Sequence, residues 1–201
     1  MKILLPLVVG ILGFLILYGV DYFDLKKKRL LKFFTWFLGI TLLLISHLQI
    51  VLTSKIIIFP EFLKSIGIVL LVIFFILLLY SVFIEISVLG KKGYAVSSSG
   101  LIKSGTYALS RHPGVLWYIM TLIFLFIATG AKHLLYAIPV WSIMDILYAI
   151  LQDLYFFPRL FGEEYDDYKK STPMILPSFK SIRSCILSYR KILLIDEDQT
   201  A

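Results

Sequence analysis

The chain has 201 residues, of which 59% are hydrophobic and 15% aromatic, and its mean hydropathy is +0.90. Only 16% of the residues are charged, against roughly a quarter in ordinary soluble domains. This composition excludes a soluble enzyme, a disordered chain and a disulfide scaffold, and the length predicts one domain. The net charge of +7 alone would suit nucleic acid or an anionic membrane surface. The long apolar runs favour the membrane, so no nucleic-acid partner is expected.

Five apolar blocks predict transmembrane helices, because each is close to the roughly 20 residues that cross a bilayer core. The first block is interpreted as a retained span, since its positive charges follow it and it lacks a small-x-small cleavage site. The fold class expected is therefore all-α, a polytopic membrane helix bundle with about five transmembrane helices. The blocks cover residues 3–20, 33–53, 66–89, 115–130 and 134–157.

The distribution of Lys and Arg predicts the orientation. Sixteen of the 20 basic residues lie in the first and third connections and in the tail after the fifth block, and four lie on the other side. Basic connections stay in the cytoplasm, so the amino terminus is expected outside and the carboxyl terminus in the cytoplasm. The cytoplasmic connection 90–114 is rich in glycine, which lets backbone approach a ligand closely. Chemistry is therefore expected at the cytoplasmic face.

The first informative motif ends that connection. It reads Gly105-Thr106-Tyr107-Ala108-Leu109-Ser110-Arg111-His112-Pro113. A planar guanidinium here would suit an anionic group of a ligand. The alternative is a helix-entry loop in which Arg111 and His112 touch lipid phosphates and Pro113 is an ordinary first-turn proline.

The second feature is a set of polar residues in the fifth block, Asp145, Gln152 and Asp153. At 100° per residue, Asp145 and Gln152 nearly superpose and Asp153 lies about 80° away, so one stripe facing the bundle interior is expected. Acids within spans usually mark a site or a paired network. Alternatively, Asp153 reaches water near Arg159 at the membrane edge, and Asp145 makes a buried hydrogen bond to a neighbouring helix.

Two other ionisable residues lie in predicted spans. Glu85, near the end of the third block, is expected to face either the cavity inside the bundle that the polar stripe would line or the membrane interface. For His47 in the second block, hydrogen-bonded packing is favoured over a role as a ligand. The spacings predict no metal site, and the sequence has neither a Walker A loop nor a dinucleotide fingerprint. The single cysteine, Cys185, excludes an internal disulfide.

The third motif lies after the fifth block and reads Phe161-Gly162-Glu163-Glu164-Tyr165-Asp166-Asp167-Tyr168. Taken with the first motif, it resembles the isoprenylcysteine carboxyl methyltransferase family of integral-membrane methyltransferases, and also phospholipid amine methyltransferases. That pattern is Gly-x-Tyr and Arg-His-Pro in a cytoplasmic loop, a span, a helical hairpin, and then Phe-Gly-x-x-Tyr-x-x-Tyr. The resemblance covers roughly residues 85–177. The residues that carry it are Gly105, Tyr107, Arg111, His112, Pro113, Phe161, Gly162, Tyr165 and Tyr168, with Leu89-Gly90 as a preceding pair.

The chain departs from the family pattern at three places. Val115 stands where the family has a tyrosine, two residues after the proline. Asp153 and Leu154 stand where the family has a Glu-Glu pair. A histidine expected shortly before Leu-Gly is absent, with Glu85 nearby. These departures favour an alternative in which the chain keeps the family fold without its activity.

The resemblance implies a methyltransferase-like membrane domain over residues 1–177, a basic cytoplasmic tail over 178–201, and S-adenosylmethionine as cofactor. Arg111 and His112 would hold the cofactor carboxylate, Asp153 its ammonium, and Tyr107 its adenine or sulfonium. Catalysis would rest on alignment and desolvation. The expected catalytic residues are Arg111 and Asp153, and the expected cofactor-binding residues are Gly105, Tyr107, Arg111, His112, Pro113, Asp153 and Tyr165.

Three functional hypotheses follow. The first is methyl transfer to a lipidic or small hydrophobic acceptor with a carboxylate, amine or thiol nucleophile, which would enter sideways from the membrane lipids. The second is a catalytically degenerate relative that binds lipid or acts as a membrane scaffold. The third is an NADPH-dependent membrane reductase, because sterol reductases share a related carboxy-terminal architecture. The tail from residue 178 predicts either an interfacial helix on anionic lipid or a frayed basic segment.

Overall fold

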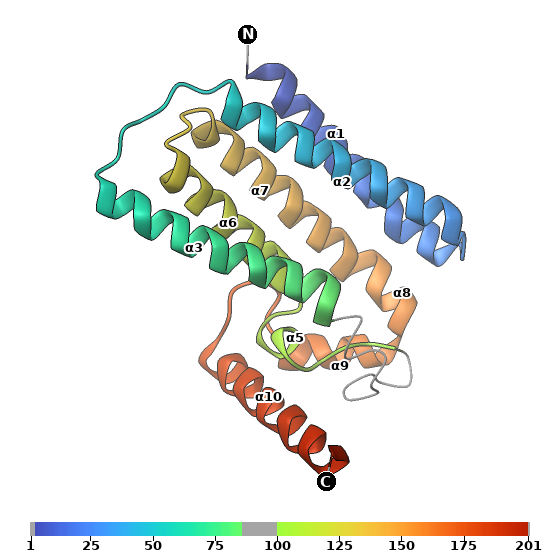
Figure 1. Ribbon diagram of the computed structural model, residues 1–201. Helices are drawn as coiled ribbons and strands as arrows, with labels where there is room; N and C mark the ends of the chain where they lie inside the picture. The colour runs from blue at the N-terminus through green and yellow to red at the C-terminus, as the bar shows by residue number, and fades with distance from the viewer. Residues whose placement is uncertain (1–2, 86–99, 201) are drawn as a thin grey trace. The chain divides into compact units, whose positions relative to one another are not determined.

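The computed structural model describes residues 3–85 and 100–200, with side chains described up to residue 191. In these ranges the regular structure is helical, apart from isolated bridge residues such as the antiparallel pair Ile56 and Ala131. The prediction of an all-α fold is therefore confirmed (Figure 1). The predicted Leu89-Gly90 pair and residues 90–99 of the Gly-rich connection lie outside the described residues. The chain divides into two compact units, the first formed by Met1–Phe74 and Tyr118–Phe156 and the second by Phe75–Trp117 and Phe157–Ala201.

Four helical stretches are long and apolar enough to cross a membrane, which suggests a membrane protein. The first two are α1 (Leu4–Leu25) and α2 (Arg29–Leu52). The third is α3 (Glu61–Leu79), which continues as the π-helix η1 (Tyr80–Glu85). The fourth is α7 (Leu134–Leu151), which continues through the π-helix η2 (Gln152–Phe156) into α8 (Phe157–Phe161). The remaining predicted span, the fourth block, corresponds to α6 (Pro113–Thr129), which is apolar but only 17 residues long.

The helices begin and end at positions that depend on particular side chains, and these positions differ from the ends of the apolar blocks. Helix α1 continues five residues past its apolar block, since Asp21 is buried in the first unit and accepts a hydrogen bond from Gln152 at 2.9 Å. Helix α3 begins at Glu61, whose charge suits the positive end of the helix dipole. Pro113 is the first residue of α6, a position where its missing N–H costs nothing.

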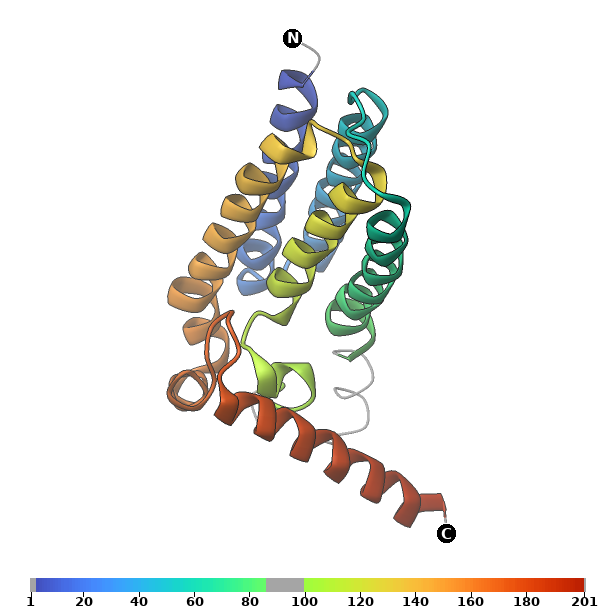
Figure 2. The same cartoon turned by 90° about the vertical axis from the view of Figure 1, so that its left-hand side faces the viewer.

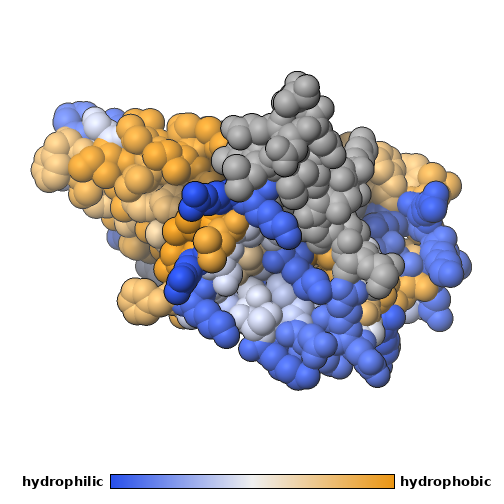
Figure 3. Space-filling view, turned by 90° about the horizontal axis from the view of Figure 1, so that it is seen from below, coloured by the Kyte–Doolittle hydropathy of each residue, from blue (hydrophilic) through white to orange (hydrophobic). Residues whose placement is uncertain are grey.

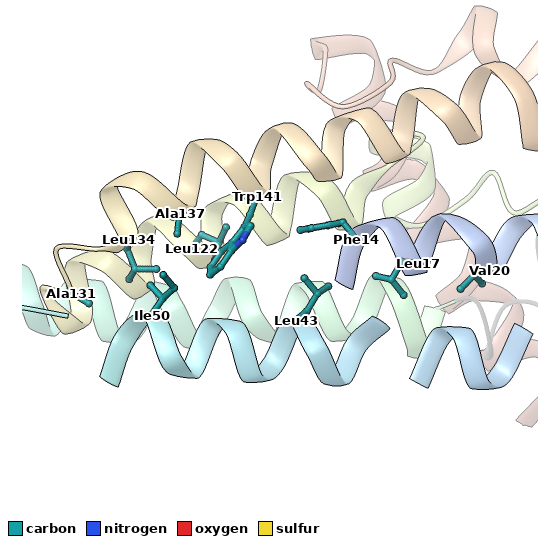
Figure 4. Close-up of a cluster of buried hydrophobic side chains, with 10 residues drawn as sticks. All are labelled: Phe14, Leu17, Val20, Leu43, Ile50, Leu122, Ala131, Leu134, Ala137 and Trp141. Carbon is teal, nitrogen blue, oxygen red and sulfur yellow. The ribbon is translucent and has the colours of Figure 1, made fainter. Parts of the chain in front are cut away.

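The core of the first unit is a continuous apolar cluster between α1, α2, α6 and α7 (Figure 4). Trp141, Ile50 and Leu134 at its centre are fully buried. The outer surfaces of these helices are also apolar, as Leu5, at 67% exposure, illustrates. Apolar side chains on both the inner and the outer faces are typical of helices that are surrounded by lipid. The cluster consists of Phe14, Leu17, Val20, Leu43, Ile50, Leu122, Ala131, Leu134, Ala137 and Trp141.

Glycines allow α1 and α2 to approach closely. A Cβ atom on Gly39 would lie 2.7 Å from Leu17 and 3.1 Å from the carbonyl oxygen of Gly13. A Cβ atom on Gly10 would lie 2.3 Å from the indole nitrogen of Trp141. Small residues at helix contacts are a general device of membrane helices, where close backbone packing stabilises the pair.

The second unit contains the short helix α5 (Thr106–Leu109), α8, α9 (Glu163–Ser171) and α10 (Phe179–Thr200). Its own small core joins Leu101, Tyr165 and Tyr168, with Phe157 and Phe161 packed against them. Residues 179–200 of the predicted tail are helical, and α10 lies beside α5 (Figure 2). This unit therefore carries both motifs on which the family resemblance rests.

Candidate functional site in the second unit

The first motif is shaped by Gly105, which comes directly before α5. Its φ of +63° is a conformation that favours glycine. A Cβ atom at this position would lie 1.7 Å from a carboxylate oxygen of Glu85. The backbone N–H of Gly105 donates to the hydroxyl of Ser188 on α10 at 2.5 Å. Glycine is thus required here both by the backbone angle and by the close approach of a buried acid.

Glu85 anchors this loop. Its side chain is fully buried and accepts hydrogen bonds from the backbone N–H of Thr106 at 2.7 Å and from the Thr106 hydroxyl. The Tyr189 hydroxyl of α10 donates to the same carboxylate at 3.0 Å. Glu85 thus joins the loop to α10, and whether it also faces a cavity or the interface, as the sequence suggested, stays a prediction.

Arg111 and His112 run beside the segment that follows α9. The Arg111 N–H donates to the carbonyl of Pro173 at 2.9 Å, and the His112 N–H to that of Met174 at 3.0 Å. The Arg111 guanidinium donates through Nη1 to the carbonyls of Thr172, at 2.6 Å, and of Lys169, at 3.2 Å. These carbonyls belong to the carboxyl end of α9, where helix carbonyls lack partners within the helix. Arg111 therefore caps α9, and its side chain remains partly exposed.

Tyr107 links the first motif to the third. Its own hydroxyl donates to the carbonyl of Ser81 at 3.2 Å, and its carbonyl accepts a hydrogen bond from the Tyr168 hydroxyl at 2.5 Å. Burial raises the pKa of the Tyr107 phenol well above its ordinary value, and the nearby charge of Glu85 adds to this effect. The phenol is therefore a neutral hydrogen-bond donor rather than a base.

Tyr165 and His112 belong to the aromatic packing of this unit. Tyr165 is 1% exposed and contacts Phe157 with ring centroids 5.4 Å apart. The His112 ring stacks on Phe157, with ring centroids 5.7 Å apart and an interplanar angle of 9°. The Lys169 ammonium lies 5.8 Å from the Tyr165 ring centre. Because these rings are so deeply packed, we expect Tyr165 to stabilise the loop through core packing and not to contact a ligand directly.

Asp153 belongs to the first unit, on the π-helix η2, and is 4% exposed. Its neighbour Leu154, at the position of the second family acid, is 67% exposed. Asp153 and Glu85 both lie on π-helical turns, which are often found at functional sites. The predicted partnership of Arg111 and Asp153 joins residues of different units and stays a prediction.

Other polar groups of the predicted stripe form a network inside the first unit. Gln152 donates to Asp21, and the Tyr148 hydroxyl contacts the same carboxylate. Tyr18 stacks on Tyr148 with ring centroids 4.9 Å apart, and its hydroxyl donates to the Met144 carbonyl at 2.8 Å. These bonds satisfy polar groups within an apolar bundle, so they indicate a structural network.

His47 has the packed environment that the sequence favoured. One ring nitrogen lies 2.6 Å from the Leu43 carbonyl and the other 2.8 Å from the Tyr118 hydroxyl. Its ring stacks on Trp141 at 4.1 Å. Both nitrogens are thus engaged inside the helix bundle. Within the described ranges, no group of three His, Cys, Asp or Glu side chains could hold a metal.

A cavity of about 110 Å³ lies in the first unit. It is lined by the segments 56–59 and 127–130 together with Glu61 and Lys64. The predicted site residues do not line it, and its volume is well below the roughly 300 Å³ at which pockets for small organic ligands begin. We assign no cofactor to it.

The structure thus brings together, within the second unit, Gly105, Tyr107, Arg111, His112, Pro113 and Tyr165. It also adds residues that motif analysis missed, namely Ser188 and Tyr189 of α10 and the carbonyls after α9. Ser181, Cys185 and Ser188 recur at helical spacing, which could have indicated a docked face of α10. Comparisons with protein-family models, with curated proteins and with solved structures found no match.

Proposed function

We propose that the chain is a membrane-embedded methyltransferase that uses S-adenosylmethionine and acts on a lipidic or small hydrophobic acceptor. The observation that supports this proposal is the joining of the first and third motifs in one unit. The Tyr168 hydroxyl reaches the Tyr107 carbonyl and the Arg111 guanidinium reaches the Thr172 carbonyl, each across 61 residues of sequence. The residues that the resemblance groups as one site therefore share one substructure, except Asp153, which belongs to the first unit.

The chemistry of the donor groups fits the cofactor in part. Arg111 offers a permanently charged, partly exposed guanidinium for a carboxylate, and Asp153 offers a carboxyl group for an ammonium. Tyr107, His112 and Tyr165 hold the loop through packing and hydrogen bonds. When bound, the cofactor would supply an activated methyl group. A carboxylate acceptor would need no base, whereas an amine would have to lose a proton, and the neutral Tyr107 phenol is unsuited to take it.

A degenerate, lipid-binding relative is the second candidate. It is favoured by Leu154, because an exposed leucine at the position of the second family acid removes one charge from the expected site. In this case the second unit would keep its hydrogen bonds without methyl transfer. The reductase hypothesis gains no observation of its own.

We also propose that α6 is a fifth span, with the amino terminus outside and the proposed site at the cytoplasmic membrane face. The proposal rests on the strong bias of Lys and Arg toward one set of connections. It places the loop with Gly105 and Arg111 on the same side as α10.

The binding experiment uses the full chain in nanodiscs, with titration calorimetry of S-adenosylmethionine. Arg111→Ala should weaken binding at least tenfold, since a charge-assisted bond contributes about 1.5–3 kcal/mol. Lys103→Ala is the matched control in the same unit, where Lys103 pairs with Glu164 at 2.7 Å on the surface, and should change affinity less than twofold. Arg111→Lys keeps the charge but not the planar fork and should fall between the two.

Thermal unfolding of each variant separates binding from folding, because Arg111 also caps α9. Equal effects of Arg111→Ala and Lys103→Ala would contradict the site assignment. Label transfer from the cofactor to a lipid extract tests turnover. Cofactor binding without transfer would favour the degenerate relative, and binding of NADPH in its place would favour the reductase.

A further inference from the structure

Helix α10 presents three distinct faces over residues 179–191. The face toward the second unit carries Ser181, Cys185, Ser188 and Tyr189, which lie within about 100° of one another at 100° per residue. Ser181 is 1% exposed, and Ser188 and Tyr189 make the hydrogen bonds to Gly105 and Glu85. Burial raises the pKa of the Tyr189 hydroxyl well above its ordinary value, with contributions from Tyr80 and Glu85. This face of α10 is thus packed against the loop that contains Gly105 and against Glu85.

The second face is apolar and exposed. Phe179, Ile182 and Ile186 fall within an arc of about 60° and are 93%, 42% and 64% exposed. Leu176, just before the helix, is 75% exposed. An apolar strip of this length has no partner within the described part of the chain, and its exposure to water would be unfavourable.

The third face adjoins the apolar strip and is basic apart from Leu187, which is 53% exposed. Arg183 and Arg190 lie next to the strip, and Lys180 and Lys191 lie further round the helix, all of them exposed. Residues 179–191 contain these four cations and no acid. Seen from below, the molecule has apolar and hydrophilic surface next to each other (Figure 3). An apolar strip flanked by cations fits a partner whose outer layer is anionic and whose interior is apolar.

We propose that this outer surface of α10 binds the interface of an anionic lipid bilayer, with the apolar strip at the acyl boundary and the arginines on lipid headgroups. Charge complementarity supports this occupant, since the four exposed cations of residues 179–191 match the phosphates of anionic lipid. Apolar burial and attraction to anionic lipid together determine such binding. The proposal goes beyond methyl transfer, because it concerns a surface and not the cofactor loop.

The surface has a direct connection to the loop through the opposite face of the helix. Because Tyr189 and Ser188 contact Glu85 and Gly105, a bilayer that holds α10 also fixes one wall of the loop. The surface therefore gives the second unit its own membrane contact, separate from the spanning helices.

Spin labels at single cysteines test the proposal with the full chain in nanodiscs. In a Cys185→Ser background, labels are placed at Ile186→Cys on the apolar strip and at Ser184→Cys, about 160° away around the helix. Collision rates with oxygen and with a water-soluble nickel complex report depth. In discs of phosphatidylcholine with phosphatidylglycerol, the Ile186→Cys label should favour oxygen and the Ser184→Cys label nickel.

The role of charge is tested by Arg183→Gln with Arg190→Gln. With both arginines replaced, the Ile186→Cys label should become more accessible to nickel in the anionic discs. With both arginines present, the same label should become more accessible to nickel in discs of phosphatidylcholine alone. The proposal is overturned if this label is nickel-accessible in anionic discs, or if its protection is independent of lipid charge. Protection that persists in detergent and rises with protein concentration would indicate a second copy and also overturn it. None of these readouts depends on methyl transfer, so either proposal can fail alone.

Discussion

At the scale of single residues, Glu85 determines how the second unit is held together. Its carboxylate accepts two hydrogen bonds from Thr106 and one from Tyr189 while shielded from water. Because a buried acceptor is strongly disfavoured without its donors, the loop and α10 are expected to form and separate together.

Glu85→Gln tests this expectation. The amide offers one acceptor oxygen in place of two and brings an N–H₂ group toward existing donors, which should weaken the docking of α10 by about 1–3 kcal/mol. Burial, and secondarily the charge of Glu85, raise the pKa of the Cys185 thiol. Removing that charge lowers the pKa, so the thiolate forms at lower pH. Cys185 should then react with a maleimide faster, with its pH profile shifted downward.

The control for this variant is Glu61→Gln, which removes an acid from the exposed first turn of α3. It should leave the rate and pH profile of Cys185 unchanged. Tyr189→Phe removes the α10 donor alone and should raise the rate while the charge of Glu85 remains. An unchanged rate in both Glu85→Gln and Tyr189→Phe would contradict the docking role.

Two glycines with similar backbone angles separate strain from steric clash. Gly105 and Gly162 have φ of +63° and +61°, but a Cβ on Gly162 would meet nothing within 4 Å, whereas one on Gly105 would meet Glu85. Gly162→Ala should cost about 1–3 kcal/mol from backbone strain. Gly105→Ala should cost more, and should also expose Cys185. Thermal unfolding and thiol labelling measure the difference, and equal costs would show that Glu85 can move aside.

At the scale of elements, helix type was readily predicted but helix ends were not. The apolar blocks located α1, α2, α3, α6 and α7, since length and hydropathy alone determine which segments suit a bilayer. The continuation of α1 to Leu25 depends on Asp21 meeting Gln152, and that partner lies 131 residues away. The π-helical turns likewise have no periodic signal in the sequence.

The pairing of α1 with α2 depends on the glycines at their contact. Gly39→Leu should lower stability by about 1–3 kcal/mol, because added bulk in a packed contact forces the helices apart. Thr41→Leu places the same side chain on the same helix at a half-exposed position, where the threonine hydroxyl donates to the Phe37 carbonyl. Tryptophan fluorescence during heating in detergent measures both variants. A smaller loss for Gly39→Leu than for Thr41→Leu would contradict the close packing.

At the scale of the whole molecule, the arrangement of the chain across the membrane is a prediction from charge. Single cysteines at Lys28 and Lys132, in a Cys185→Ser background, test it with a membrane-impermeant maleimide on intact cells. Lys132→Cys should be labelled and Lys28→Cys only after permeabilisation, because the first basic connection is expected inside. The reverse pattern would invert the proposed orientation, and labelling of both would contradict the number of spans between them.

The sequence predicted which residues of the candidate site lie in the same unit better than it predicted the contacts that they make. The spacing of Arg111, Tyr107 and Tyr168 pointed to one loop and one helix, and both lie in the second unit. The roles of Ser188, Tyr189 and the carbonyl of Thr172 come from segments that fold back over long sequence separations, which no local pattern encodes. That Tyr165 contacts a ligand stays a prediction, whereas its burial is a property that only tertiary packing reveals.

The hydroxyls of Ser188 and Tyr189 on α10 also affect how far the chain can be truncated from its carboxyl end. A chain shortened before Ser188 would lose the acceptor for the Gly105 N–H and the phenol that reaches Glu85. Its spanning helices could still insert normally, so it would pass tests of expression and membrane targeting. Truncation from the carboxyl end should therefore yield protein that is expressed normally but has a loosened loop, and a lack of activity in that protein would say nothing about the intact chain.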